Sequence, residues 1–316
     1  MGTVQRRSVF HTRRTDAVLL LVAIVWGSSY LAAKTATHAL PVLVVLFARY
    51  AISAIACLAL VATRRRKERC TRDEVRVGSV LGVTQAAVLV LETYGVAHTS
   101  AANAGLIISL TIVLTPLLDR TTDNGRLPPR FFAATGVCLV AVALLMSGSG
   151  FHTPGIGDLL MLAAAVVRAA HVALVGRLTK GRVVRPLQLT AVQTGVGSAL
   201  FVVPAASALP TLTRVDTAVW SQLVYLALFC SVFAFLAQTW AVQNSSASRA
   251  SLLLGTEPVW AVVVGVCLGG EGFSVLTGLG AALMVTGTYW GQHIERTHRT
   301  THIEESPCRT TAPMSV

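Results

Sequence analysis

Apolar stretches close to twenty residues long recur along nearly the whole chain, and short polar segments separate them. A helix that crosses a hydrocarbon core of about 30 Å needs about 20 mainly apolar residues, because each residue adds about 1.5 Å. The pattern therefore predicts an all-α integral membrane protein with ten transmembrane helices. The predicted spans are residues 17–36, 41–62, 77–97, 101–119, 131–148, 158–178, 187–209, 218–242, 249–269 and 273–291.

The composition favours a membrane setting and argues against a nucleic-acid partner. Hydrophobic residues make up 53% of the chain, charged residues only 13%, and the mean hydropathy is +0.66. A soluble protein carries about 25% charged residues. The net charge of +12 comes from Lys and Arg residues in short segments between the spans. Such clusters orient membrane proteins and contact anionic lipid, so we expect membrane lipids and no nucleic acid as partners.

The distribution of Lys and Arg also predicts the orientation. If the N-terminus is cytoplasmic, 22 of the 26 basic residues fall in inside segments, and only Lys34 and Arg214 fall outside. Basic residues accumulate in cytoplasmic loops, so both termini are expected in the cytoplasm of a multi-pass plasma-membrane protein. The run 17–36 has the length of a span and no clear signal-cleavage site, so it is expected to remain as the first helix.

A faint internal repeat divides the chain in two. Residues 93–96 (Thr-Tyr-Gly-Val) match residues 239–242 (Thr-Trp-Ala-Val) at a shift of 146. Five helices per copy is an odd number, so the second copy would enter the membrane from the opposite side, as in many secondary transporters. We therefore predict two inverted five-helix repeats at 17–148 and 157–291, a cytoplasmic N-terminal segment at 1–16 and a disordered cytoplasmic tail at 292–316.

An ordered set of short motifs resembles the EamA-type carriers of the drug/metabolite transporter superfamily. The motifs are Trp26-Gly27-Ser28-Ser29-Tyr30, Ala48-Arg49-Tyr50, Gly157-Asp158, Glu257-Pro258, Gly270-Glu271, Gly280 and Gly287. The resemblance implies ten helices, cytoplasmic termini and passage of small organic solutes through a central cavity, without naming the solute. The chain departs from the pattern at Thr111-Ile112, where the repeat would place a second Glu-Pro pair, and at Arg168, where an aromatic or apolar residue is more usual.

Five ionisable residues lie inside predicted spans: Arg49, Glu92, Arg168, His171 and Glu257. Each charge costs at least about 2.5–3.5 kcal/mol at the centre of a span, which makes it a functional candidate. Alternatively, Arg49 pairs with Glu92 and Arg168 pairs with Glu257, and the pairs only hold helices together. The sequence leaves both interpretations open, with Arg49 and Glu92 as a structural or gating ion pair.

Two helix faces are candidates for a central cavity. Arg168 and His171 are three residues apart and share one face of span six. Trp26, Ser29 and Tyr30 form a stripe on span one, the corresponding helix of the first repeat. We expect these five residues to contact substrate, although a packing stripe would have the same spacing.

Glu257 lies in the segment Gly255-Thr256-Glu257-Pro258 within span nine. Proline has no backbone N–H and glycine loosens the turn, so this helix is expected to be interrupted. An interrupted span that carries an acid is a sequence pointer to a carrier site. A buried carboxyl group can bind and release a proton during a transport cycle, and we therefore assign coupling to Glu257. The alternative is a packing role for this side chain.

Other function classes have little support in the sequence. The six cysteines are scattered without metal-ligand spacing, and there is no Walker A or HExxH motif, so we expect no metal, no cofactor and no enzyme activity. We predict a secondary transporter that exports a small organic solute (an amino acid, a metabolite or a drug-like compound) by alternating access. The sequence leaves proton coupling and a homodimer open. The alternatives are a membrane-embedded lipid-modifying enzyme and a scaffold without transport.

The predicted topology can be tested by labelling single cysteines with a membrane-impermeant reagent in a variant that lacks the natural cysteines. Cysteines in 149–156 and 209–217 should react in intact cells, because these loops are expected outside. Cysteines in 63–76 should react only after permeabilisation. Labelling of 63–76 in intact cells would reverse the orientation.

Overall fold

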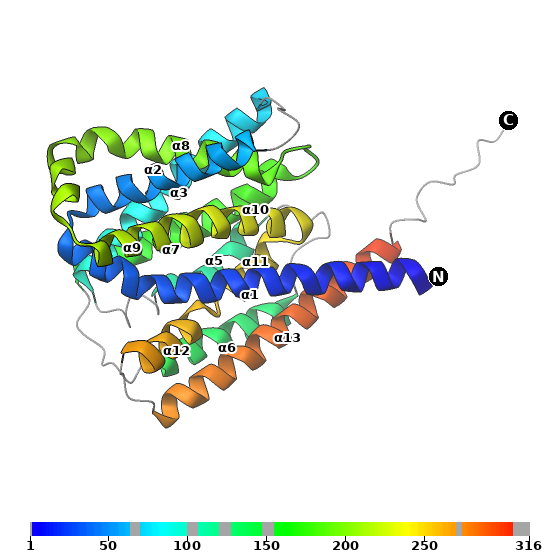
Figure 1. The fold of residues 1–316 in the computed structure, drawn as a ribbon. Coiled ribbons are helices and arrows are strands. Elements are labelled where there is room, and N and C mark those ends of the chain that lie inside the picture. The colour runs from blue at the N-terminus through cyan, green and yellow to red at the C-terminus, as the bar shows by residue number, and fades with distance from the viewer. Residues whose placement is uncertain are drawn as a thin grey trace.

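The computed structural model describes residues 2–63, 70–99, 107–119, 128–146, 155–269 and 274–305. Regular structure in these ranges is entirely helical (Figure 1). The first-half helices are α1 (Gly2–Ala39), α2 (Val42–Ala62), α3 (Arg72–His98), α5 (Thr111–Leu118) and α6 (Pro129–Met146). The second half contains α7 (Ile156–Thr179), α8 (Pro186–Ala205), the 3₁₀ helix η2 (Ala206–Arg214), α9 (Thr217–Ala227), the π-helical turn η3 (Leu228–Phe233), α10 (Ala234–Asn244), α11 (Ala247–Leu254), α12 (Glu257–Gly269) and α13 (Val275–Glu305).

Several of these helices have the length and composition of membrane spans. Within the described ranges, six helical segments qualify, and Pro129–Leu144 is a shorter apolar helix. Large apolar side chains such as Ile55, Leu58 and Val203 are exposed on their outer surfaces. Large apolar side chains on the outside of a helical bundle can pack against lipid tails, so their exposure fits a multi-pass membrane protein.

The other four predicted spans are not among these six segments. Span 101–119 lies partly outside the described residues, and span 131–148 corresponds to the short helix α6. Span 249–269 is divided into α11 and α12, and span 273–291 forms the first part of α13. The basic run at 64–69 and the pair Gly270-Glu271 lie outside the described residues.

The helix interruption expected near Glu257 is present. Residues Gly255 and Thr256 form a turn, and α12 begins at Glu257 with Pro258 as its second residue. A β-carbon at Gly255 would lie 2.3 Å from the side chain of Ile112, so a larger residue at this position would require Ile112 to move. The first half also has a turn, at Ser109 and Leu110, immediately before α5 begins.

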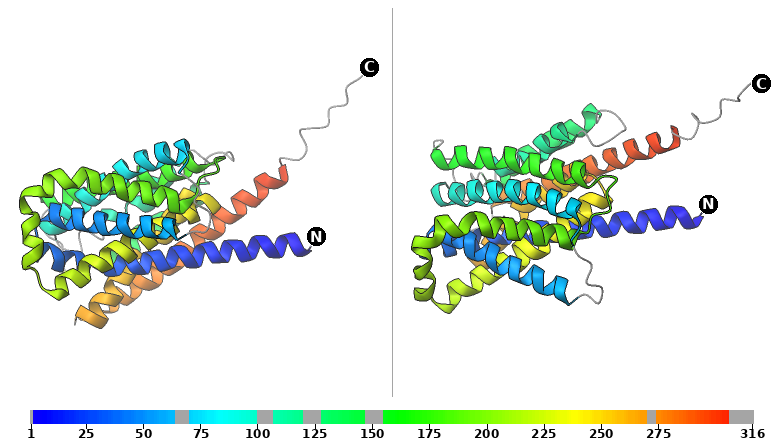
Figure 2. Two further views of the ribbon diagram at one scale, coloured as in Figure 1. Left: turned by 45° about the horizontal axis from the view of Figure 1, so that its top comes forward. Right: turned by 90° about the horizontal axis from the view of Figure 1, so that it is seen from above.

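Helices extend into both of the predicted terminal segments. α13 continues to Glu305, so residues 292–305 of the tail expected to be disordered are helical, and residues 306–316 lie outside the described residues. The extension is held by tertiary contacts, because Gln292 and Glu295 are buried and Ser246 donates a hydrogen bond of 2.8 Å to Glu295. α1 likewise includes most of the segment 1–16. Figures 1 and 2 show the start of α1 and the end of α13 projecting from the same end of the bundle.

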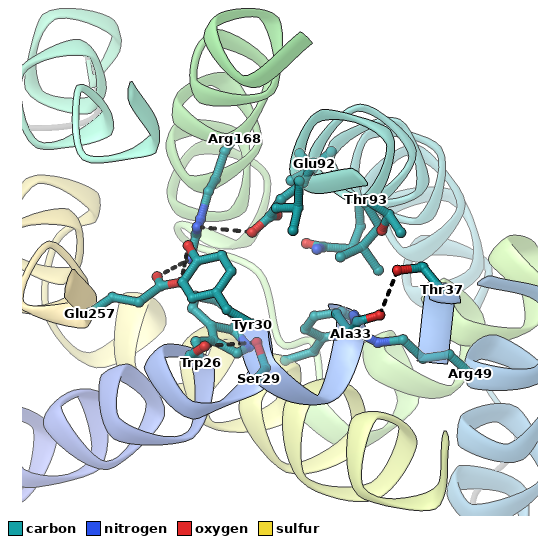
Figure 3. A pocket seen from close by; sticks show the side chains of 15 residues that line it. Trp26, Ser29, Tyr30, Ala33, Thr37, Arg49, Glu92, Thr93, Arg168 and Glu257 are labelled. Atoms are coloured by element: carbon teal, nitrogen blue, oxygen red, sulfur yellow. Dashed lines mark hydrogen bonds and ion pairs between the residues drawn. The ribbon is translucent and has the colours of Figure 1, made fainter. Parts of the chain in front are cut away.

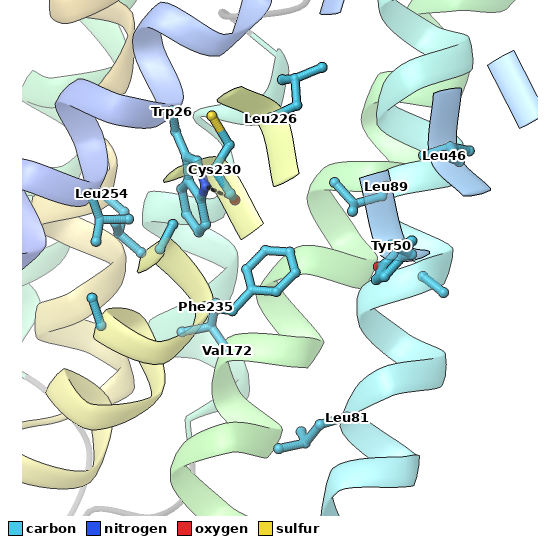
Figure 4. Packing of buried hydrophobic residues seen from close by; sticks show 14 of the residues in the cluster. Trp26, Leu46, Tyr50, Leu81, Leu89, Val172, Leu226, Cys230, Phe235 and Leu254 are labelled. Atoms are coloured by element: carbon cyan, nitrogen blue, oxygen red, sulfur yellow. Dashed lines mark hydrogen bonds between the residues drawn. The ribbon is translucent and has the colours of Figure 1, made fainter. Parts of the chain in front are cut away.

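Helices from both halves share one core. Figure 4 shows Leu81 and Leu89 of α3 in the same cluster as Val172 of α7 and Phe235 of α10. α1 also approaches the helix break closely, at Gly27, where a β-carbon would lie 2.7 Å from the Glu257 carbonyl oxygen. Glycine at this position therefore lets α1 pack directly on α12.

Gly27→Ala should destabilise the protein by about 1–3 kcal/mol, because the new methyl group collides with the backbone of α12. Gly195→Ala is the matched control: its β-carbon meets nothing within 4 Å, and it should be neutral or slightly stabilising. Thermal unfolding of both variants in detergent measures the difference. Equal melting temperatures would contradict the close packing of α1 on α12.

Candidate functional site

A cavity lies among α1, α2, α3, α7, α10 and α12, and its volume is about 590 Å³ when the solvent space at its mouth is included (Figure 3). Polar and ionisable side chains make up much of its wall. The lining residues are Trp26, Ser29, Tyr30, Ala33, Thr37, Arg49, Gln85, Val88, Leu89, Glu92, Thr93, Val96, Arg168, Phe235 and Glu257. The wall thus includes two arginines and two glutamates within an otherwise apolar bundle.

Arg168 of α7 joins the two glutamates of the cavity. Its Nη2 donates to Oε2 of Glu257 at 2.9 Å, and its Nη1 lies 3.8 Å from Oε1 of Glu92. The Arg168 and Glu257 side chains are only 10% and 5% exposed. A pair with so little water around it interacts more strongly than a surface pair, but each charge depends on the other for compensation.

Two aromatic side chains of α1 complete the surroundings of this ion pair. The Tyr30 hydroxyl donates to Oε1 of Glu257 at 2.8 Å, so both carboxylate oxygens of Glu257 are bonded. The guanidinium of Arg168 lies 4.5 Å from the ring centroid of Trp26, a favourable cation–π distance. The stripe predicted on α1 therefore faces the ions, as Figure 3 shows.

The π-helical turn η3 anchors two residues of the cavity. The carbonyl oxygen of Cys230 accepts from Nε1 of Trp26 at 3.0 Å and from Nη2 of Arg49 at 3.1 Å. Arg49 also donates from Nε to the Ser231 hydroxyl at 2.6 Å. π-helical turns are rare and occur often at functional sites, since they change which backbone groups are bonded within the helix.

The sequence-based pairing was half correct. Arg168 pairs with Glu257 as one interpretation expected. Glu92, however, lies beside Arg168, whereas Arg49 bonds to Ser231 and to the Cys230 carbonyl, so the Arg49–Glu92 pair is absent from these contacts. The difference arises because α3 packs on α7, which brings Glu92 to the second half of the protein.

His171 is placed differently from the substrate-contacting role expected for it. It is buried, lies outside the cavity lining and shares a hydrogen bond of 2.8 Å between its Nδ1 and the Thr84 hydroxyl of α3. Residues three apart on a helix differ by about 60° in direction, because the helix has 3.6 residues per turn. That rotation leaves Arg168 in the cavity and directs His171 against α3.

Sequence reasoning missed one wall of the cavity. Six residues of α3 line it, at positions i, i+3, i+4, i+7, i+8 and i+11: Gln85, Val88, Leu89, Glu92, Thr93 and Val96. This spacing is that of a single helix face, and the polar members Gln85 and Glu92 could have revealed it. Thr37 and Phe235 also line the cavity and carry no comparable sequence signal.

A second group of ions lies toward the start of α1. Arg249 of α11 donates from Nη2 to both carboxylate oxygens of Asp16 at 2.6 and 2.7 Å, and its Nη1 lies 3.6 Å from Glu295 of α13. Asp16 and Tyr30 are separated by about 21 Å along α1, at about 1.5 Å per residue. This ion group therefore lies well away from the cavity, toward the end of the bundle from which the start of α1 and the end of α13 project.

Another ion pair joins the two halves at the beginning of α3. Arg185 donates from Nε and Nη2 to the two carboxylate oxygens of Glu74 at 2.8 and 2.7 Å. This two-point geometry is the strongest that arginine and a carboxylate form. Among the residues that the structure describes, no three His, Cys, Asp or Glu side chains gather as a metal site would require.

Removal of one member of the Arg168–Glu257 pair should destabilise the folded protein. Arg168→Ala leaves Glu257 and Glu92 without a cation, and loss of one partner from a buried pair typically costs about 3–5 kcal/mol. The double variant Arg168→Leu, Glu257→Leu removes both charges and should recover most of the lost stability. Thermal unfolding in detergent checks this order. A double variant as unstable as Arg168→Ala would contradict the coupling of these charges.

Comparison with known proteins identifies a transporter family and several relatives that are named as transporters. The model of the EamA-like transporter family matches the chain twice, over residues 13–147 and 155–290. A relative from Archaeoglobus fulgidus, described as an uncharacterized transporter, is 28% identical over 85% of this chain and 83% of its own length. The uncharacterized transporter YyaM of Bacillus subtilis is 27% identical over 61% of this chain and 65% of its own.

A protein of known crystal structure shares the fold. It superposes with a TM-score of 0.76 at 19% identity, over 90% of this chain and 98% of the other. The two family matches together cover most of the 316 residues. The chain belongs to the EamA-like transporter family.

Proposed function

We propose that this protein is a secondary transporter that exports a small organic solute across the plasma membrane by alternating access. The observation that carries the proposal is the cavity, with a buried Arg168–Glu257 pair at a helix interruption. Interrupted helices near the membrane midplane are where carriers of several folds bind solutes and ions. Family membership and the names of the relatives favour transport over a membrane-embedded enzyme or a passive scaffold.

The proposal includes ten spans arranged as two inverted repeats, with both termini cytoplasmic. The turns at Ser109-Leu110 and at Gly255-Thr256 support it, because they are separated by 146 residues, the shift found in the sequence. The contacts between halves support it too. α1 packs on α12 as α7 packs on α5, and α3 packs on α7 and α8 as α9 packs on α1 and α2. Such exchange of partners is expected of two repeats related by a twofold axis.

The position of the ion groups relative to the cavity supports the proposal of alternating access. The cavity extends from Arg168 toward Thr37, near the end of α1. Two ion pairs lie on the opposite side of Arg168. Arg249 of α11 binds Asp16 of α1, and Arg185, the residue before α8, binds Glu74 of α3. Under the proposed topology, this conformation is open to the outside and closed to the cytoplasm. Transport would require both ion groups to separate while the outer end closes.

Proton coupling is assigned to Glu257. In an outward-open cavity its carboxylate can receive a proton from outside, which weakens its attraction to Arg168. After the protein reorients, loss of the proton to the cytoplasm restores the pair. An inward proton would in this way be exchanged for an outward solute, which favours export. Tyr30 of α1 donates a hydrogen bond to the same carboxylate, so protonation of Glu257 would weaken this contact between α1 and α12.

Glu257→Gln should abolish uphill transport, because the amide keeps the shape of the protonated acid and cannot release a proton. Flux of a radiolabelled metabolite panel is measured in proteoliposomes with and without an imposed pH gradient. For any solute that wild type accumulates, the variant should still catalyse exchange down its gradient. Uphill accumulation by Glu257→Gln would remove Glu257 from the coupling role.

Asp73→Asn is the control for this experiment. It removes an exposed carboxylate from the first turn of α3, outside the cavity and outside both ion groups. Gradient-driven accumulation should therefore survive, apart from changes in the amount of folded protein. If wild type itself moves no member of the panel in either condition, the transport function proposed here is wrong.

A further inference from the structure

A second pocket borders the Arg168–Glu257 pair. This inner pocket lies between α5 and α11, which do not line the cavity, and α7 and the start of α12, which do. Its volume is about 330 Å³ when the open space at its mouth is included. Among the described residues, Arg168 and Glu257 line both spaces. Figure 3 shows this pair at one end of the cavity and Arg49 and Thr37 at the other, so the ion pair separates the cavity from the inner pocket.

Hydroxyl groups on α5 and α11 line the inner pocket. Thr115 is fully buried, and its Oγ1 has no hydrogen-bond partner among the described residues. The Thr111 hydroxyl donates to the Ile108 carbonyl at 2.9 Å, and the Ser251 hydroxyl donates to the Ser248 carbonyl at 2.8 Å. Both oxygens can still accept hydrogen bonds. A buried hydroxyl without a partner is destabilising, and water in a polar pocket removes that cost.

The helix interruption adds another acceptor to the inner pocket. Leu254, Gly255 and Pro258 all line it. Proline has no backbone N–H, so the helical hydrogen bond from residue 258 to the Leu254 carbonyl cannot form. The interruption that places Glu257 at the start of α12 therefore also leaves a carbonyl group available to water close to this carboxylate.

The inner pocket extends from Glu257 toward the ion group at the start of α1. Thr115 lies about one turn before Asp119, which follows the last residue of α5. Asp119 accepts hydrogen bonds from the hydroxyl and the N–H of Ser248 at 3.0 and 3.2 Å. Ser248 precedes Arg249, the residue that binds Asp16. Under the proposed topology, these groups face the cytoplasm.

We propose that the inner pocket is a water-filled route by which Glu257 releases its proton to the cytoplasm. The O–H bond of the protonated carboxyl group breaks, and its proton passes to a water molecule that is hydrogen-bonded to the Thr115 hydroxyl. That water passes a proton on toward Asp119, and the Glu257 carboxylate remains beside Arg168. This inference rests on the proposed coupling role of Glu257 and adds the path that its proton takes.

The groups around Glu257 are consistent with this assignment. The ionisable side chains that face it within the described ranges are Tyr30 of α1, Glu92 of α3, Arg168 of α7 and Cys230 of η3. Of these, Arg168 also lines the inner pocket. A guanidinium keeps its proton throughout the physiological pH range. Glu257 is therefore the group of this shared wall that can release a proton into the inner pocket.

Radiolytic hydroxyl labelling of the purified full-length protein in detergent tests whether the inner pocket holds water. Radicals formed from bound water oxidise the side chains beside it, and mass spectrometry locates the products. Leu254 and Pro258 should be labelled more strongly than Leu189, which is fully buried outside both spaces. Thr115→Val should lower the labelling of both residues toward that of Leu189. Labelling of Leu254 and Pro258 no stronger than that of Leu189 in wild type would show a dry pocket and overturn the proposal.

Thr190→Val is the matched control. Thr190 is also fully buried, its hydroxyl also lacks a partner among the described residues, and it lies on α8 outside both spaces. This variant should therefore leave the labelling of Leu254 and Pro258 unchanged. An equal decrease in Thr190→Val and Thr115→Val would reflect a general change in packing and would contradict a specific role for Thr115.

Transport in proteoliposomes tests the route itself. For a solute that wild type accumulates, Thr115→Val should slow accumulation driven by the pH gradient about tenfold, the effect of about one lost hydrogen bond. Exchange of the solute down its own gradient should continue, because it releases no net proton. Thr115→Ser keeps the hydroxyl and should accumulate solute as wild type does, and Thr190→Val should do the same. If Thr115→Val folds poorly, Ser251→Ala removes a hydroxyl from the opposite helix and should have the same selective effect.

The outcomes separate this inference from the proposed function. Wild-type accumulation by Thr115→Val, or by Ser251→Ala in its place, overturns the route and leaves the coupling role of Glu257 intact. Loss of accumulation and exchange together, in Thr115→Ser as well as Thr115→Val, assigns Thr115 a packing role and also overturns the route. If the pH gradient drives no accumulation by wild type, the coupling role of Glu257 is wrong and the route is wrong with it.

Discussion

The buried ion pair between Arg168 and Glu257 is the constraint on which the arrangement of the cavity depends. Neither charge is tolerable alone inside a membrane, so α7 and α12 must keep the two side chains in contact or provide a substitute. Tyr30 and Trp26 of α1 contact the same pair through a hydrogen bond and a cation–π interaction. One pair thereby links helices of the first and second halves at the centre of the protein.

Backbone irregularities place these charges where a regular helix could not. Gly255 and Thr256 interrupt the helix so that Glu257 stands at the beginning of α12, close to Gly27 of α1. The π-helical turn directs the Cys230 carbonyl toward Trp26 and Arg49. Both features lie in the second half, which accounts for much of the functional asymmetry of the cavity. The first half has a turn at the corresponding place but bears Thr111 instead of an acid.

The same structure separates two kinds of ion pair. Arg249 with Asp16 and Arg185 with Glu74 have short contacts at two carboxylate oxygens, so they are suited to holding helices together. Glu92 and Arg49 in the cavity are incompletely compensated and are suited to a ligand. In the proposed alternating-access cycle, the closed side and the side that is open to bind solute would exchange in each turnover.

The sequence by itself determined the helical membrane class, the family and the position of the helix interruption. These follow from hydropathy, motif order and the chemistry of Gly255 and Pro258, all of which are local properties of the chain. It also indicated the inward stripe of Trp26 and Tyr30. Only the tertiary structure decided that Glu92 joins Arg168, that His171 turns to Thr84 and that α13 continues to Glu305. These outcomes depend on which helices become neighbours and on a rotation of about 60° along one helix, and spacing within a single segment specifies neither.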